Sequence, residues 1–127
     1  MHDDRPRRHA RQSVRISASY GHATVRVRLL SVRAPTGARI AVLCRGHGCP
    51  VRSLTRLAAA GNLAGRPVRF RRLERRLRPG VVIEVRISKA GEIGKYTRFT
   101  IRRHQFAARM DTCLGTDART PVACPQS

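Results

Sequence analysis

A short apolar strand that runs into a glycine-rich cysteine loop, at residues 37–50, constrains the fold of this chain more than any other stretch. Ile40, Val42 and Cys44 share one parity of a two-residue period, so we expect these side chains to face a core. The glycines and the proline that follow end the strand and let Cys49 turn back. This pattern predicts a β-protein, but it indicates no substrate and no reaction.

The chain is strongly basic, with 27 Lys and Arg residues against 7 Asp and Glu residues and a formal net charge of +20. Its 127 residues suffice for one domain with a modest core, and aromatic residues make up only 4%, so the core must be aliphatic. A polyanion relieves the self-repulsion of a polycation, so nucleic acid, anionic lipid and acidic cell-wall polymer are the expected partner classes. Arginine supplies nearly all of this charge, which a GC-rich genome would also produce.

Four cysteines form an even set in a small domain, which indicates an oxidising compartment. They are Cys44, Cys49, Cys113 and Cys124. Of the three possible pairings we favour Cys44 with Cys49 and Cys113 with Cys124, because each pair flanks a glycine-containing turn. Free thiols are one alternative. A zinc site that includes His47 is another, although the spacing of the second pair does not suit a compact zinc knuckle.

The N-terminal residues differ in composition from the rest of the chain. Residues 1–12 are charged and have little to bury, so we expect a disordered basic tail followed by a single domain at 13–125. The start shows no apolar segment of a secretory signal, and no stretch approaches the roughly 18 apolar residues of a membrane span. The cysteines favour an extracellular or cell-envelope location, and the missing signal favours the cytoplasm as the alternative.

Alternating patterns predict strands in the first part of the domain. One begins at Ser13, where apolar and polar residues alternate. In residues 23–32 the apolar Val25, Val27 and Leu29 oppose arginines, which predicts a half-buried antiparallel strand.

Residues 52–78 are ambiguous. Two sets of apolar residues have helical spacing, and they are Leu54, Leu57 and Ala58, followed by Phe70, Leu73 and Leu77. This spacing predicts a short helix within the segment. Val68 also alternates with Phe70 as in a strand, so the strand remains an alternative.

The strongest pattern is a hairpin across residues 81–101. Two runs of alternating residues flank a glycine-containing turn, and they are Val81, Ile83, Val85 and Ile87, then Thr97, Phe99 and Ile101. With the strands at 23–32 and 38–44, the hairpin gives at least four antiparallel strands. We therefore expect an all-β fold, a small antiparallel sandwich like immunoglobulin and fibronectin domains in architecture, with two cysteine loops. The segment from His104 onwards is expected to be loop.

Several stretches resemble an uncharacterised extracellular β-domain, often in tandem, of high-GC actinobacteria. The stretches are residues 32–50, with the signature Cys-x-Gly-x-Gly-Cys-Pro, and residues 77–87, 93–102 and 113–124. The resemblance covers about residues 22–125 and implies a β-sandwich-like fold, export and disulfides, without implying an activity. It also implies a strand at 68–70 and a connecting turn at 73–77 in place of the helix.

The sequence contains no recognised catalytic motif. There is no nucleophile elbow, zinc-protease motif or phosphate-binding glycine loop. Glu74, Glu84 and Glu92 lie in an arginine-rich segment, at an outward strand position and in a turn, where solvated or salt-bridged carboxylates are usual. His22 and His104 flank strands, as surface histidines do. We therefore expect a non-enzymatic protein without a cofactor or a bound metal.

The best candidate binding site is an arginine cluster in residues 66–78. It consists of Arg66, Arg69, Arg71, Arg72, Arg75, Arg76 and Arg78. Guanidinium groups bind phosphate and carboxylate in a bidentate manner. In a helix, Arg69, Arg72 and Arg76 would lie near one face and follow a phosphate backbone without selecting a base sequence. A solvated charge run without a ligand is the alternative.

Two functional hypotheses follow. The one we favour is a secreted or cell-envelope-associated β-domain with a structural or adhesive role, which binds anionic wall polymer or lipid headgroups. The alternative is a cytoplasmic, arginine-rich protein that binds nucleic acid non-specifically, although the scarcity of aromatic residues argues against base recognition. The redox state of the cysteines distinguishes the two.

Overall fold

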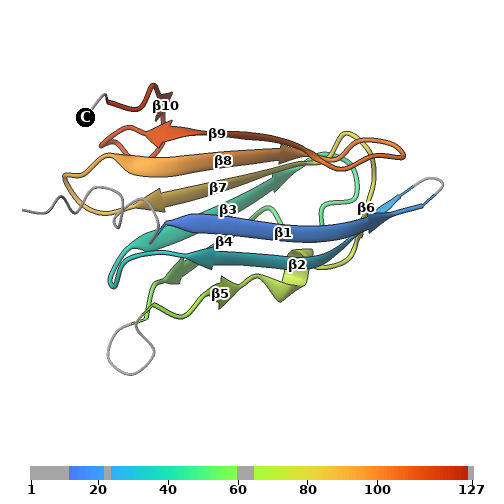
Figure 1. Cartoon of the computed structure of the whole chain (residues 1–127), viewed down its shortest axis with the longest axis horizontal. Helices are drawn as coiled ribbons and strands as arrows, with labels where there is room; N and C mark the ends of the chain where they lie inside the picture. Colours follow the sequence, from blue (N-terminus) through green and yellow to red (C-terminus); the bar gives the residue numbers. More distant parts are fainter. Residues whose placement is uncertain (1–11, 22–23, 60–64, 126–127) are drawn as a thin grey trace, which may run out of the picture.

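The computed structural model describes residues 12–21, 24–59 and 65–125, and these residues form two antiparallel sheets and one 3-10 turn (Figure 1). The two sheets share one hydrophobic core, so the predicted all-β sandwich is confirmed. Residues 1–11, most of the tail expected at 1–12, lie outside the described residues.

The smaller sheet, sheet A, is built around β2 (Val25–Arg33). β1 (Ser13–Tyr20) pairs with one edge of β2 along its whole length. Two short strands, β5 (Val68–Arg69) and β6 (Arg76–Leu77), pair with the two ends of the other edge. Sheet A is therefore narrow, with one continuous edge strand and one interrupted edge.

The larger sheet, sheet B, has six strands in the order β10-β9-β8-β7-β3-β4. In that order they are β10 (Pro121–Val122), β9 (Ala108–Leu114), β8 (Gly94–Thr100), β7 (Val82–Ser88), β3 (Arg39–Arg45) and β4 (Ser53–Leu57). β7 and β8 are the predicted hairpin. The expectation of loop from His104 onwards is wrong, because β9 extends the hairpin by pairing with β8 over its full length.

The core is mainly aliphatic, as the composition predicts, and it also contains Phe70 and Phe99. It is made by the inward residues of both sheets, which alternate with outward residues along each strand. Leu30 of β2, Val85 of β7 and Phe99 of β8 are each 0% exposed. The expected inward set of the hairpin, Val81 to Ile87 in alternation, is buried.

A β-bulge in β2 changes which residues face the core. The pairing with β1 shifts between Ser17, opposite Leu29, and Ala18, opposite Val27, so Arg28 has no partner in β1. Beyond the bulge the parity is reversed, and Leu30 is buried instead of the predicted Leu29. Strict alternation along the sequence cannot reveal an extra residue in one strand.

The helix predicted within residues 52–78 is a misinterpretation of apolar spacing. Leu54 and Leu57 lie in strand β4, and the only helical turn among the described residues is the 3-10 turn η2 (Arg71–Leu73). Residues 66–78 instead form β5, η2 and β6, close to the strand and turn implied by the family resemblance. Phe70, Leu73 and Leu77 are nevertheless all buried, because the strand, turn and strand each direct one of them inward.

Both predicted disulfides are present. Cys44–Cys49 closes the glycine loop after β3, and Cys113–Cys124 ties β9 to the segment after β10. Gly46 has a φ of +117°, and a Cβ atom there would lie 3.1 Å from the Cα of Val81, so this position requires glycine. The cysteine loop thus packs directly against the start of the hairpin.

The two described ends of the chain lie at the same end of the sandwich. β1 starts beside the end of β2, where Ser13 is paired with Arg33. β10 lies at the left of Figure 1, on the same side as the start of β1.

Candidate functional site

The outward face of sheet A consists almost entirely of arginine and serine. On β1 the residues that alternate with the inward Val14, Ile16 and Ala18 are serines and one arginine. We define the arginine face as the outward arginines of β1 and β2 together with those of residues 66–78. It comprises Arg15, Arg26, Arg28, Arg33, Arg66, Arg69, Arg71, Arg72, Arg75, Arg76 and Arg78, all of which are exposed.

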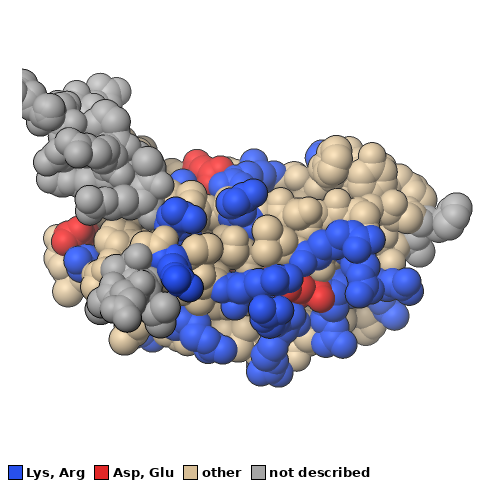
Figure 2. All heavy atoms as spheres, turned by 60° about the horizontal axis from the view of Figure 1, so that its bottom comes forward, with Lys and Arg blue, Asp and Glu red and all other residues tan. Residues whose placement is uncertain are grey.

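Figure 2 shows basic side chains gathered over one part of the surface that contains β2, β5 and β6, around a small acidic patch. All seven arginines of the predicted cluster in residues 66–78 are exposed. The expected helical face of Arg69, Arg72 and Arg76 is not formed, because the segment is not a helix. Instead, pairing with β2 places Arg69 opposite Ser31 and Arg76 opposite Arg26.

Four members of the arginine face, Arg15, Arg26, Arg28 and Arg33, were not among the predicted site residues. They come from β1 and β2 and join the predicted cluster only through the long-range pairing of β2 with β5 and β6. The alternation of valine and arginine in β2 already indicates that these side chains point away from the core. The sequence does not indicate which other strand they meet.

Arg69 has a structural partner within the face. Its Nε donates hydrogen bonds to both carboxylate oxygens of Glu74, at 2.9 and 2.8 Å. The same carboxylate accepts a hydrogen bond from the backbone amide of Leu30, just after the bulge, at 3.0 Å. Burial would raise the pKa of Glu74, but these hydrogen bonds and the charges of Arg69 and Arg71 lower it below its ordinary value. Glu74 therefore fills the gap between β5 and β6.

Like charges are left directly opposite each other on the face. Arg26 and Arg76 are cross-strand partners, and neither forms an ion pair with a described residue. Opposed like charges in a sheet are destabilising. On the other side of β2, Arg26 is opposite Ser19, whose hydroxyl accepts a hydrogen bond from the Nε of Arg28.

The carboxylates of sheet B are paired with basic residues of the same sheet. Glu84, predicted at an outward position, is 7% exposed and contacts Arg45 at 2.9 Å and Arg86 at 3.1 Å. Neither of these arginines belongs to the arginine face. Glu84 therefore leaves the positive charge of sheet A unneutralised.

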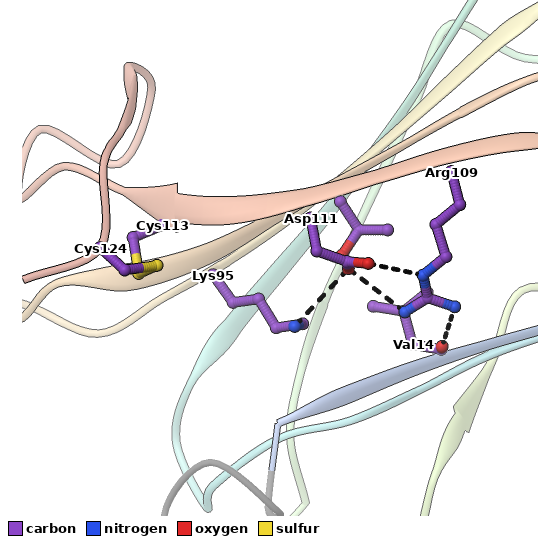
Figure 3. Close-up of polar contacts among 7 residues, drawn as sticks. Val14, Lys95, Arg109, Asp111, Cys113 and Cys124 are labelled. Atoms are coloured by element: carbon purple, nitrogen blue, oxygen red, sulfur yellow. Dashed lines mark hydrogen bonds and ion pairs between the residues drawn. A yellow bond between two sulfur atoms is a disulfide. The ribbon is translucent and has the colours of Figure 1, made fainter.

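Asp111 lies where β9 extends past β1. It accepts hydrogen bonds from Arg109 at 2.7 Å and from Thr97 at 2.6 Å, and Lys95 lies 3.6 Å away (Figure 3). Partial burial would raise the pKa of Asp111, but these partners outweigh it and lower the pKa from 3.8 to about 2. Arg109 Nη1 also donates to the backbone carbonyl of Val14 at 2.9 Å, so this cluster joins sheet B to the edge of sheet A.

The described residues show no group of side chains that could hold a metal ion. No cluster of three or more His, Cys, Asp or Glu side chains is present among them. All four cysteines are in disulfides, which contradicts the zinc and free-thiol alternatives. His104 donates from Nδ1 to the carbonyl of Gly21 at 2.9 Å, while His22 lies outside the described residues. The remaining chemistry of the surface is that of hydrogen-bond donors and positive charge.

The comparisons with known proteins give no match, since no family model, curated protein or solved structure is significantly similar to this chain. The resemblance to the actinobacterial β-domain therefore stays a prediction. Within the described residues no helix has the length and apolar character needed to cross a membrane. The two disulfides indicate an oxidising environment.

Proposed function

We propose that this chain is a non-enzymatic β-domain of the extracellular space or the cell envelope, with an adhesive or structural role, whose arginine face binds an anionic polymer of the cell wall. One observation carries the proposal. The outward positions of sheet A present guanidinium and hydroxyl donors, and Glu74, the carboxylate that pairs with the face, is engaged by Arg69 and the amide of Leu30. Such a surface suits a ligand that offers only anionic oxygens.

The disulfides support a location in the extracellular space or the cell envelope. Cys44–Cys49 and Cys113–Cys124 each close a short loop next to a strand end. Disulfides persist in oxidising compartments and are rare in the cytosol. They favour the envelope over the alternative of a cytoplasmic nucleic-acid-binding protein.

The test is co-sedimentation of the disulfide-intact protein with isolated cell walls, before and after chemical extraction of their anionic polymers. We expect binding that weakens with salt and is lost after extraction. A triple variant of the face, Arg26→Gln, Arg33→Gln and Arg76→Gln, should bind at least about tenfold more weakly. Unchanged binding to extracted walls would contradict the proposal, and so would tighter binding to anionic vesicles or to DNA than to walls.

A matched control separates the effect of the face from that of total charge. Arg39→Gln, Arg98→Gln and Arg119→Gln remove the same charge from exposed positions in sheet B and the C-terminal loop. None of these three arginines forms an ion pair with a described residue. If both triple variants lose binding equally, the arginine face is not the binding site.

A further inference from the structure

The outward face of sheet A lacks aromatic and exposed apolar side chains, which limits the kinds of ligand that it can bind. The serines and arginines of β1 and β2 are interrupted only by the half-buried Leu29. Of the exposed large hydrophobic side chains among the described residues, Leu57, Ile93 and Phe106 lie outside sheet A. Tyr20 ends β1 at a position of inward parity and contacts Phe106 instead of the outward face. A face without aromatic platforms cannot stack nucleobases, and a face without exposed apolar side chains has nothing to insert into a bilayer.

The strand geometry sets the distance between neighbouring hydrogen-bond donors on the outward face. Outward side chains recur every second residue, about 6.6 Å apart, along β1 and along β2 on each side of the bulge at Arg28, and neighbouring strands lie about 4.8 Å away. The outward positions from Arg26 to Arg33 are paired with Ser19 to Ser13 of β1 and therefore span roughly 20 Å. Two residues of an extended polypeptide contain about six backbone bonds, as does one repeat of a phosphodiester chain with a three-carbon spacer. The charges of such a chain therefore recur at nearly the spacing of the outward side chains.

The arrangement across the strands also favours an anion between them. Arg26 faces Arg76 on one side and Ser19 on the other, so a phosphate above β2 would meet two guanidinium groups and a hydroxyl. Two strand steps further along β1, Arg15 is opposite Ser31, which is 6% exposed, and Ser31 is opposite Arg69, which Glu74 already binds. Guanidinium groups thus recur along β1 and β2, at Arg26 with Arg76, then at Arg15, then at Arg33.

From this repeat we infer that the ligand of the arginine face is a linear polyphosphodiester without bases, such as a poly(glycerol phosphate), which lies along β2 and is held through successive phosphates. The inference rests on the proposed function and names the chemistry of its ligand. The guanidinium groups bind the phosphate oxygens, and the serine hydroxyls donate to the same oxygens. No base sequence or lipid chain takes part in the recognition.

The test measures affinity of the disulfide-intact chain for oligo(glycerol phosphate) of increasing length by calorimetry at fixed salt. We expect affinity to rise steeply up to about four repeats, the length that spans Arg26 to Arg33, and then only by the statistical factor. The triple variant Arg26→Gln, Arg33→Gln and Arg76→Gln should reduce the slope of log affinity against log salt by about 2, because three phosphate contacts are removed. The sheet B control variant should keep the wild-type slope.

Three probes of equal charge decide between ligand chemistries. Inorganic polyphosphate has a much shorter repeat, polyglutamate offers carboxylates, and oligo(dT) has the phosphodiester repeat with bases. Each should bind at least about fivefold more weakly than oligo(glycerol phosphate), since none combines the repeat with a backbone free of bases. Equal or tighter binding of any of them, or affinity that keeps rising at the same rate beyond about eight repeats, would overturn the inference.

The experiment distinguishes a failure of this inference from a failure of the proposed function. Binding of polyglutamate or polyphosphate as tight as that of oligo(glycerol phosphate) would overturn this inference but leave the proposed binding of wall polymer intact. Absence of binding to all polyanions would overturn both. The length series uses the unmodified chain, so its outcome does not depend on whether a variant folds.

Discussion

At the scale of single residues, Asp111 is the centre of the contact that fixes the edge of sheet A to sheet B. Its carboxylate orients Arg109, and Arg109 reaches the carbonyl of Val14 on the neighbouring sheet. The guanidinium of Arg109 also lies 5.2 Å from the ring centre of Phe99, a cation–π distance. One carboxylate thus organises a contact between strands that are far apart in the sequence.

We expect Asp111→Asn to make the free energy of unfolding less dependent on pH. The folded pKa of Asp111, about 2, is below its ordinary value of 3.8. Its ionised form therefore stabilises the fold fully above about pH 4, and this contribution is lost as the pH falls towards 2. In urea titrations the variant should be about 1 kcal/mol less stable at pH 7, a modest effect because the carboxylate is partly exposed to solvent.

The difference between variant and wild type should shrink steadily between pH 4 and pH 2. A difference that stays constant over this range would show that the ionisation of Asp111 is not coupled to folding. Asp117→Asn is unsuitable as a control because the side-chain and backbone hydrogen bonds in its turn, first of all that from Thr120, also lower its pKa to about 2. Glu92→Gln, in the exposed hairpin turn, is the appropriate control.

At the scale of elements, sheet A depends on a side chain to complete its interrupted edge. β5 and β6 pair with the ends of β2, and between them the bulge leaves the amide of Leu30 to be satisfied by Glu74. Arg69 holds that carboxylate in place and also donates to the carbonyl of Arg28 at 3.4 Å. Within the arginine face, Arg69 is thus a supporting residue, and the other arginines are better placed to meet a ligand.

Glu74→Gln should lower the free energy of unfolding by about 1–2 kcal/mol, because Arg69 loses its charged partner while the amide of Leu30 keeps an acceptor. Urea denaturation at pH 7 measures the effect. The matched variant Glu92→Gln, at an exposed turn position, should change stability by less than about 0.5 kcal/mol. Equal effects of the two substitutions would mean that the carboxylate of Glu74 does not support the edge.

The other edge of sheet A is covered near both of its ends. Arg109 donates a hydrogen bond to the backbone carbonyl of Val14 near the start of β1. Just past the far end of β1, the imidazole of His104 donates a hydrogen bond to the backbone carbonyl of Gly21. Tyr20 makes an edge-to-face contact with Phe106, at 5.3 Å between ring centres. Such coverage limits pairing between the edge strands of separate molecules.

The sequence predicted those elements that are determined by residues close together in the chain. The hairpin, the strand before Cys44 and both disulfides follow from alternation and from glycine turns between cysteines. The segment of Phe70, Leu73 and Leu77 was misinterpreted because a strand, a turn and a strand can bury the same residues as a helix. The bulge at Arg28 and the meeting of β2 with β6 depend on pairing between distant residues, so the four arginines that β1 and β2 add to the face could not be assigned from sequence.

At the scale of the whole molecule, the positive charge opposes folding. The formal net charge is +20, and the carboxylates of Glu74, Glu84 and Asp111 are already engaged in ion pairs. Repulsion among the remaining guanidinium groups is long-range and is screened by salt. The stability of the sandwich should therefore depend on the ionic strength.

The midpoint of thermal unfolding should rise by several degrees between about 10 mM and 150 mM NaCl, since a gain of about 1 kcal/mol raises the midpoint by roughly 3–5 °C in a domain of this size. Differential scanning calorimetry of the oxidised protein measures it. The triple variant of the arginine face should show a smaller rise than wild type. A midpoint that falls or stays constant would mean that specific ion pairs outweigh the general repulsion.

Both described ends of the chain leave the sandwich on the same side, and this determines how the domain would respond to tension (Figure 1). A force between the start of β1 and the end of β10 loads the outermost hydrogen bonds first, so they break one after another instead of sharing the load. Neither disulfide joins β1 to a neighbouring strand, so only noncovalent contacts resist this peeling. The domain is thus suited to a position that carries little tension.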